Sequence, residues 1–89
     1  MFARQVVIQN TAGFHVRPAQ LFVEKAGEFR AQITVKTETG TAVDSKSILG
    51  LMALGLEKGT IITIEANGTD EEEAVHALAA LVESKFGEE

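Results

Sequence analysis

The chain has 89 residues, of which 45% are hydrophobic and 24% are charged, with a single proline. That length suits one domain, residues 1–89, with one modest core, and the composition excludes the polar, proline-rich sequences that stay disordered. The net charge of −5 argues against a nucleic-acid binder, which needs a basic surface, and favours protein partners. Because there are no cysteines and no apolar run long enough for a bilayer, we expect a cytoplasmic protein without membrane insertion.

The chain begins with a predicted strand and helix. Alternating apolar residues over 2–8 predict the strand, and apolar residues at helical spacing over 16–26 predict the helix. Pro18 suits the first turn of this helix because its missing N–H costs nothing there, and Gly27 is expected to end the helix.

A hairpin and a short helix are predicted next. Period-two alternation over 31–37 and the turn around Gly40 predict a strand that pairs with a short strand at 41–44. The segment KSILGLMALG predicts a helix of one or two turns, with Ser47 as its N-cap and Gly55 as its end.

The last part of the chain predicts a strand and a longer helix. Residues 60–66 are rich in β-branched side chains, and Asn67 and Gly68 mark a turn. Thr69 or Asp70 is expected to cap the final helix. The apolar stripe of that helix consists of Val75, Leu78, Leu81, Val82 and Phe86.

The predicted order is βαββαβα, which belongs to the α/β (α+β) class. Each helix has one apolar side to bury, so we expect an open-faced sandwich with a mainly antiparallel sheet and helices on one face. A ferredoxin-like arrangement gives nearly the same order, so topology alone leaves the function open.

The segment GFHVRPA, residues 13–19, carries the strongest chemical signal. His15 has an imidazole that is partly uncharged near neutral pH and can accept a phosphoryl group. The backbone N–H groups of Val16 and Arg17 lie at the predicted helix start and would hold phosphate oxygens, as would the Arg17 guanidinium. The spacing alone favours an alternative without chemistry, because short motifs often occur without function. In that alternative His15 is a polar residue at the helix end, Arg17 is a solvated charge and Pro18 only starts the helix.

GFHVRPA resembles the active-site segment of HPr, the histidine-containing phosphocarrier family of the bacterial phosphoenolpyruvate-dependent sugar phosphotransferase system. The likeness runs the full length of the chain, through KSILGLMALG and TIITIEANGTDEEEA. It implies a four-stranded antiparallel sheet with three helices on one side and no cofactor. It further implies that His15 accepts a phosphoryl group on Nδ1 from enzyme I and gives it to an enzyme IIA, with Arg17 assisting the phosphate. Such a protein is a carrier and leaves catalysis to its partners.

The KSILG segment implies a second site. Ser47 resembles the serine that HPr kinase/phosphorylase modifies in many family members, whose phosphorylated form is a partner of a transcriptional regulator. The alternative is that Ser47 serves only as an N-cap. Ile48, Leu49 and Met52 cannot all face the sheet, so we expect some of them to form an exposed partner-binding patch near His15.

Two features depart from the commonest family pattern. Ala12 stands where many members have a serine or asparagine. The turn KTETGT and the ending FGEE resemble the nitrogen-branch carrier NPr, whereas KSILGLMALG resembles the sugar branch. We prefer HPr, with NPr and a non-catalytic regulatory interaction domain as alternatives, and expect a monomer.

Two other possibilities are less favoured. A small RNA-binding domain would stack bases on aromatic side chains, but the chain has no Trp or Tyr. His76 falls on the polar side of the final helix and is expected to be solvated, and the acidic run 70–73 lacks metal-ligand spacing. We therefore predict no metal site.

Overall fold

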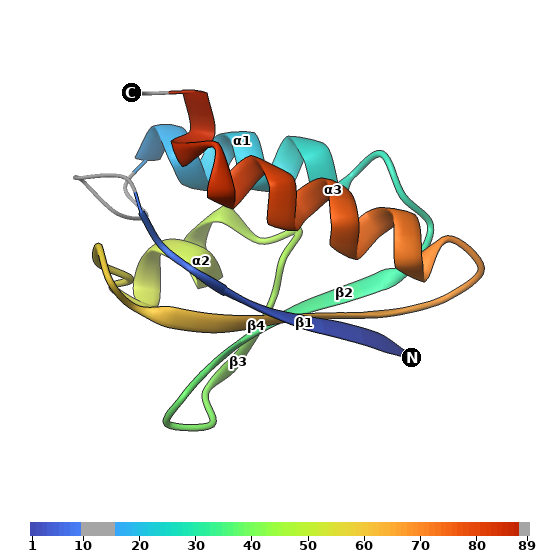
Figure 1. Cartoon of the computed structure of the whole chain (residues 1–89), viewed down its shortest axis with the longest axis horizontal. Helices are drawn as coiled ribbons and strands as arrows, with labels where there is room; N and C mark the ends of the chain where they lie inside the picture. The colour runs from blue at the N-terminus through green and yellow to red at the C-terminus, as the bar shows by residue number, and fades with distance from the viewer. Residues whose placement is uncertain (10–15, 88–89) are drawn as a thin grey trace.

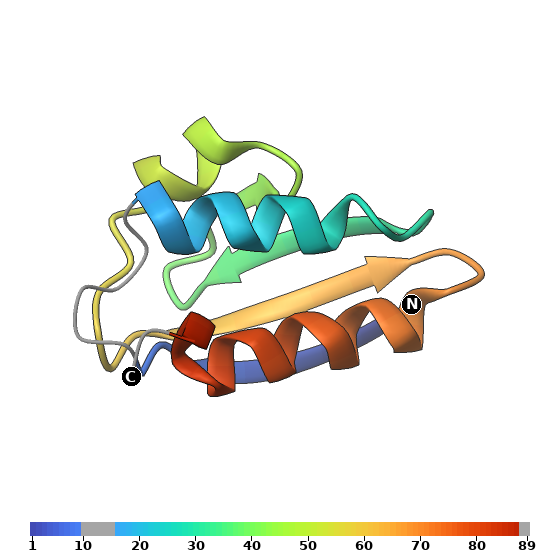
Figure 2. The ribbon, with the colours of Figure 1, turned by 90° about the horizontal axis from the view of Figure 1, so that it is seen from above.

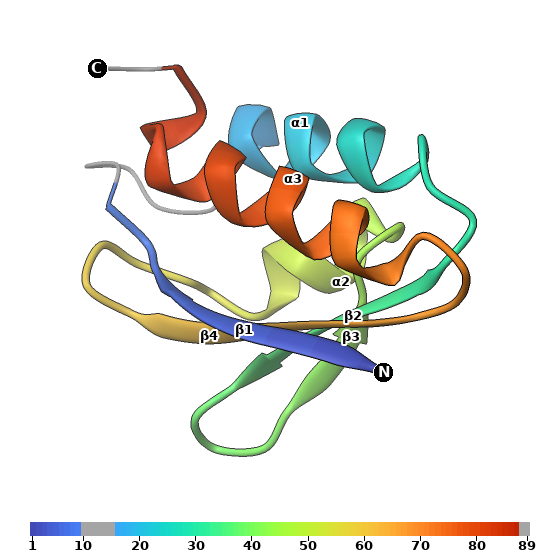
Figure 3. The same cartoon turned by 45° about the vertical axis from the view of Figure 1, so that its right-hand side comes forward.

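The computed structural model describes residues 1–9 and 16–87. Its elements are, in chain order, β1 (Phe2–Val7), α1 (Val16–Ala26), β2 (Gln32–Thr37), β3 (Ala42–Asp44), α2 (Ile48–Ala53), β4 (Ile61–Asn67), α3 (Glu71–Glu83) and the short 3-10 turn η1 (Lys85–Gly87). The four strands form one antiparallel sheet in the order β1-β4-β2-β3. All three α-helices lie on the same face of the sheet (Figures 1 and 3). The predicted open-faced sandwich is therefore confirmed.

The core lies between the sheet and the helices. In β4, Ile62, Ile64 and Ala66 point inward and are buried, while the residues between them are more exposed, as the alternation predicts. Strand pairing aligns these positions with their neighbours, for example Val6 opposite Ile62 and Val35 opposite Ile64.

Helices α1 and α3 lie side by side over the sheet (Figure 2) and pack against each other. Phe22 is completely buried in α1, and burying such a side chain contributes about 1.5–3 kcal/mol relative to leaving it exposed. The other buried residues of the two helices are Pro18, Ala19 and Ala26 in α1, and Ala74, Val75, Leu78, Ala79 and Val82 in α3. This packing fixes the start of α1 on the sheet.

The end of the final helix was predicted wrongly. Phe86 belongs to the predicted apolar stripe, but α3 ends at Glu83. Lys85 and Phe86 adopt left-handed backbone angles, with φ of 59° and 56°, which cost about 1–2 kcal/mol per residue. The turn nevertheless buries Phe86, and the apolar burial offsets this strain.

The capping prediction for α3 also needs correction. Asp70 occupies the N-cap position but makes no side-chain cap hydrogen bond. Its carboxylate instead accepts hydrogen bonds from the backbone N–H groups of Arg30 and Ala31, each at 2.8 Å. The side chain of Glu71 accepts a hydrogen bond from the Gly68 N–H at 3.1 Å. The Asp70 side chain therefore joins two loops and makes no hydrogen bond to the first turn of its own helix.

Candidate functional site

The start of α1 presents exposed groups that suit an anion. Val16 and Arg17 are exposed, whereas Pro18 and Ala19 behind them are buried. The first N–H groups of an α-helix have no partner within the helix and carry partial positive charge. Because Pro18 has no N–H, the available donors of this turn come from the residues around it.

The charges at this helix start reinforce that preference. No acidic residue lies in the first turn of α1, whereas the first turn of α3 has three glutamates. In the part of the chain that the structure describes, no carboxylate forms an ion pair with Arg17. A guanidinium has planar donors that are well suited to an anion, and no described carboxylate competes for those of Arg17.

His15, the predicted phosphoryl acceptor, lies outside the described residues. It immediately precedes Val16 in the chain. Ala12 and Gly13 also fall outside the described ranges, so what the sequence predicts for this loop remains a prediction.

Ser47 is the N-cap of α2, as predicted. Its φ and ψ of −113° and 110° are extended, and its Oγ accepts a hydrogen bond from the Gly50 N–H at 3.1 Å. The side chain satisfies one of the free donors of the helix start. The residue is only half-buried, so its side chain is partly accessible from solvent.

Helix α2 exposes most of its apolar residues. Leu51 is completely buried, but Leu49 is 81% exposed, and Ile48 and Met52 are each 37% exposed. We call Ile48, Leu49 and Met52 the α2 patch. The expectation that part of this helix would remain uncovered is confirmed.

The α2 patch and the start of α1 lie on neighbouring elements. The two helices pack against each other, and α2 lies beside the first half of α1 (Figure 2). Val16 adds an apolar side chain that is 59% exposed. The exposure of this side chain was not predicted; the signal in the sequence is that Val16 is an apolar residue outside the buried stripe of α1. An exposed apolar surface beside a helix start that could accept an anion suits a protein that binds other proteins.

The described residues offer no competing metal or membrane feature. Among residues 1–9 and 16–87, no group of three or more His, Asp or Glu side chains could hold a metal ion, and no helix is long and apolar enough to cross a membrane. His76 is exposed, as predicted, and its ring centroid lies 5.3 Å from that of Phe2.

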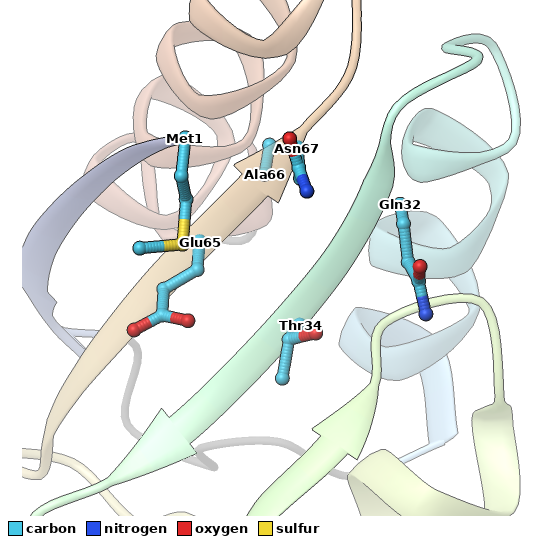
Figure 4. Close-up of a pocket in the computed structure, with 6 residues that line it drawn as sticks. All are labelled: Met1, Gln32, Thr34, Glu65, Ala66 and Asn67. Carbon is cyan, nitrogen blue, oxygen red and sulfur yellow. The ribbon is translucent and has the colours of Figure 1, made fainter.

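A pocket lies on the face of the sheet that the helices leave open (Figure 4). It is lined by Met1, Gln32, Thr34, Glu65, Ala66 and Asn67. None of the predicted site residues contributes to it. The pocket is therefore separate from the candidate site.

Comparisons with known proteins identify relatives that cover nearly the whole chain. The family model PTS-HPr, described as the PTS HPr component phosphorylation site, matches residues 2–84. Phosphocarrier protein HPr of Vibrio cholerae is 46% identical over 83 residues, which cover 93% of this chain and 96% of that protein. Phosphocarrier protein NPr of Proteus mirabilis is 37% identical over 86 residues, covering 97% and 96%. The crystal structure of an HPr from Thermoanaerobacter tengcongensis matches with a TM-score of 0.95 and 47% identity, covering 100% of this chain and 99% of that one.

Proposed function

Because the chain belongs to the HPr phosphocarrier family, we propose that it accepts a phosphoryl group on His15 from enzyme I and passes it to a sugar-specific enzyme IIA. The phosphoryl group originates in phosphoenolpyruvate. The observation that carries the proposal is the start of α1, where exposed Arg17 follows His15 within a family match whose description is a phosphorylation site.

The transfer chemistry needs an acceptor nitrogen and groups that position the phosphate and stabilise its charge. The unprotonated Nδ1 of a neutral His15 imidazole attacks the phosphorus. An N–P bond forms while the bond to the donor group on enzyme I breaks, and that group leaves with the electron pair. The onward step reverses these roles, with the acceptor on enzyme IIA as nucleophile and the imidazole as leaving group. Phosphoryl transfer depends mainly on positioning and charge stabilisation.

The residues around His15 would position the phosphate. The guanidinium of Arg17 and the N–H groups of Val16 and Arg17 donate to its oxygens. A helix N-terminus stabilises an anion by about 0.3–2 kcal/mol, which orients the phosphate without trapping it. Weak holding suits a carrier that must release the group to its next partner.

Partner docking and regulation belong to the neighbouring α2. The α2 patch is the proposed contact surface for enzyme I and enzyme IIA. Phosphorylation of Ser47 by an HPr kinase/phosphorylase would place a dianion beside this patch and weaken docking, and would offer a surface to a transcriptional regulator. We propose a cytoplasmic monomer that needs no cofactor.

A nitrogen-branch carrier is the alternative, favoured by the NPr relative and by the KTETGT turn. To test the choice, the purified protein is phosphorylated with enzyme I, Mg²⁺ and labelled phosphoenolpyruvate, and the label is then offered to enzyme IIA proteins of each branch. Faster transfer to a sugar-branch acceptor is expected. Faster transfer to the nitrogen-branch acceptor would instead indicate an NPr-type carrier. If the protein takes up no label from the enzyme I of either branch, the carrier function is excluded, and a regulatory interaction domain becomes the better explanation.

A further inference from the structure

Helix α2 is too short to hold its own position. It has six residues and buries only Leu51, whereas isolated helices shorter than about 12–15 residues are marginal in water. The orientation of the α2 patch therefore depends on the packing of α2 against α1 and β3 and on the segments that flank the helix. The turn before it, residues 44–47, is held by several hydrogen bonds.

The turn is attached to β2 through Ser45. This residue is completely buried, and both its N–H and its hydroxyl donate to the Ile33 carbonyl oxygen, at 3.0 and 2.9 Å. The Lys46 N–H donates to the carboxylate of Asp44 at 2.9 Å. These bonds fix the backbone immediately before Ser47.

Lys46 connects the same turn to the loop that leads from α1 into β2. Its ammonium donates to the carbonyl oxygens of Phe29 and Ala31, at 3.1 and 3.4 Å. The N–H groups of Arg30 and Ala31 donate to the carboxylate of Asp70. The loop is thus held on its carbonyl side by Lys46 and on its amide side by Asp70.

This loop is a firm attachment point. Gly68, just before α3, approaches it so closely that an added Cβ would lie 2.7 Å from the Ala31 Cα, a separation that real Cβ atoms essentially never show. The loop therefore has little freedom to shift toward α3. Because the Lys46 ammonium is hydrogen-bonded to this loop, the loop restricts the movement of Lys46.

We propose that Lys46 is a positioning residue for partner docking: its ammonium ties the start of α2 to the loop at residues 29–31 and so fixes the α2 patch. The inference has a structural half, that Lys46 fixes the α2 patch, and a docking half, that this fixed patch binds partners. Only the docking half rests on the proposed function. Lys46 acts through α2 and is not assigned a contact with the phosphate.

Three variants test the inference. Lys46→Gln removes the charge, Lys46→Arg keeps a cation with several donors, and Lys36→Gln is the matched control. The control also removes an ammonium group. The ammonium of Lys36, however, lies 3.1 Å from the carboxylate of Glu65 on the open face of the sheet, away from the helices.

The first measurement is amide hydrogen exchange along α2, which needs no partner protein. Lys46→Gln is expected to exchange about three- to tenfold faster at residues 50–53, the size expected from losing an exposed charge-assisted hydrogen bond. Lys46→Arg and Lys36→Gln should match the unmodified protein. Unchanged exchange in Lys46→Gln would overturn the structural half.

The second measurement is phosphoryl transfer from enzyme I with the carrier as varied substrate. Lys46→Gln is expected to raise KM about three- to tenfold while kcat stays within about twofold, because docking weakens and the reacting groups are untouched. An unchanged KM alongside faster α2 exchange would overturn the docking half. If the unmodified protein accepts no phosphoryl group, the proposed function fails, and the exchange result still decides the structural half.

Discussion

The carboxylate of Asp70 accepts a hydrogen bond of 2.8 Å from the backbone N–H of Ala31, which lies 39 residues earlier in the chain. Together with the Arg30 N–H, this contact closes the end of the molecule where α1 leads into β2 and β4 leads into α3. It also provides the attachment point for Lys46. One half-buried acidic group therefore links the ends of several elements.

The same contact makes stability depend on pH. The N–H of Arg30 is the largest cause that lowers the pKa of Asp70 below its ordinary value of 3.8, and the N–H of Ala31 adds to it. Because the folded-state pKa is lowered, the contribution is present above the ordinary pKa and lost as pH falls through the folded pKa.

We therefore expect the free energy of unfolding to fall on acidification below about pH 4, and to fall less steeply in Asp70→Asn. Urea titrations of both proteins at several pH values measure this difference. Glu71, whose pKa the Gly68 N–H lowers, contributes in both proteins. Parallel pH profiles would contradict the assignment to Asp70.

Two leucines of α2 separate stability from docking. Leu51→Ala is expected to destabilise the protein by about 2–5 kcal/mol because it leaves a cavity. Leu49→Ala should change stability by less than about 0.5 kcal/mol, because Leu49 is 81% exposed, but it should weaken enzyme I binding. Urea denaturation and calorimetric titration with enzyme I measure the two effects. Full-strength binding by Leu49→Ala would exclude it from the docking surface.

Arg17→Ala is expected to slow phosphoryl transfer from enzyme I about tenfold to a hundredfold, the size of a lost hydrogen bond between charged groups. Its thermal midpoint should hardly change, because Arg17 is exposed. Rapid-quench measurement of label uptake gives the rate. A wild-type rate in the folded variant would show that Arg17 does not assist the phosphate.

Ser47 variants distinguish charge from helix capping. Ser47→Ala loses the hydrogen bond to the Gly50 N–H, which costs about 0.5–2 kcal/mol, whereas aspartate is itself a good N-cap. If charge controls docking, Ser47→Asp binds enzyme I much more weakly than Ser47→Ala although it is the more stable protein. Equal affinities, or weaker binding by Ser47→Ala, would count against the regulatory role.

Periodicity and capping rules predicted the features that depend on neighbouring residues. The alternation of Ile62 and Ile64 identified the inward face of β4, and the position of Ser47 before an apolar run identified its cap. The role of Asp70 was missed because its partners Arg30 and Ala31 lie 40 and 39 residues earlier in the chain. The role of Lys46 was missed because its partners lie 17 and 15 residues earlier, beyond the range of local sequence patterns.

The end of α3 shows a different limit. Phe86 continues the helical apolar pattern, so spacing alone extends the helix through it. The chain instead uses a left-handed turn to bury the same side chain. Burial was predicted correctly and the backbone was not, because several backbone paths can bring one side chain to the core.

The most direct test of the carrier assignment is to locate the phosphoryl group. The chain has two histidines, so His15→Ala and His76→Ala form a matched pair, and each is incubated with enzyme I, Mg²⁺ and labelled phosphoenolpyruvate. The account predicts an acid-labile label on the unmodified protein and on His76→Ala, and none on folded His15→Ala. Equal labelling of His15→Ala would contradict it.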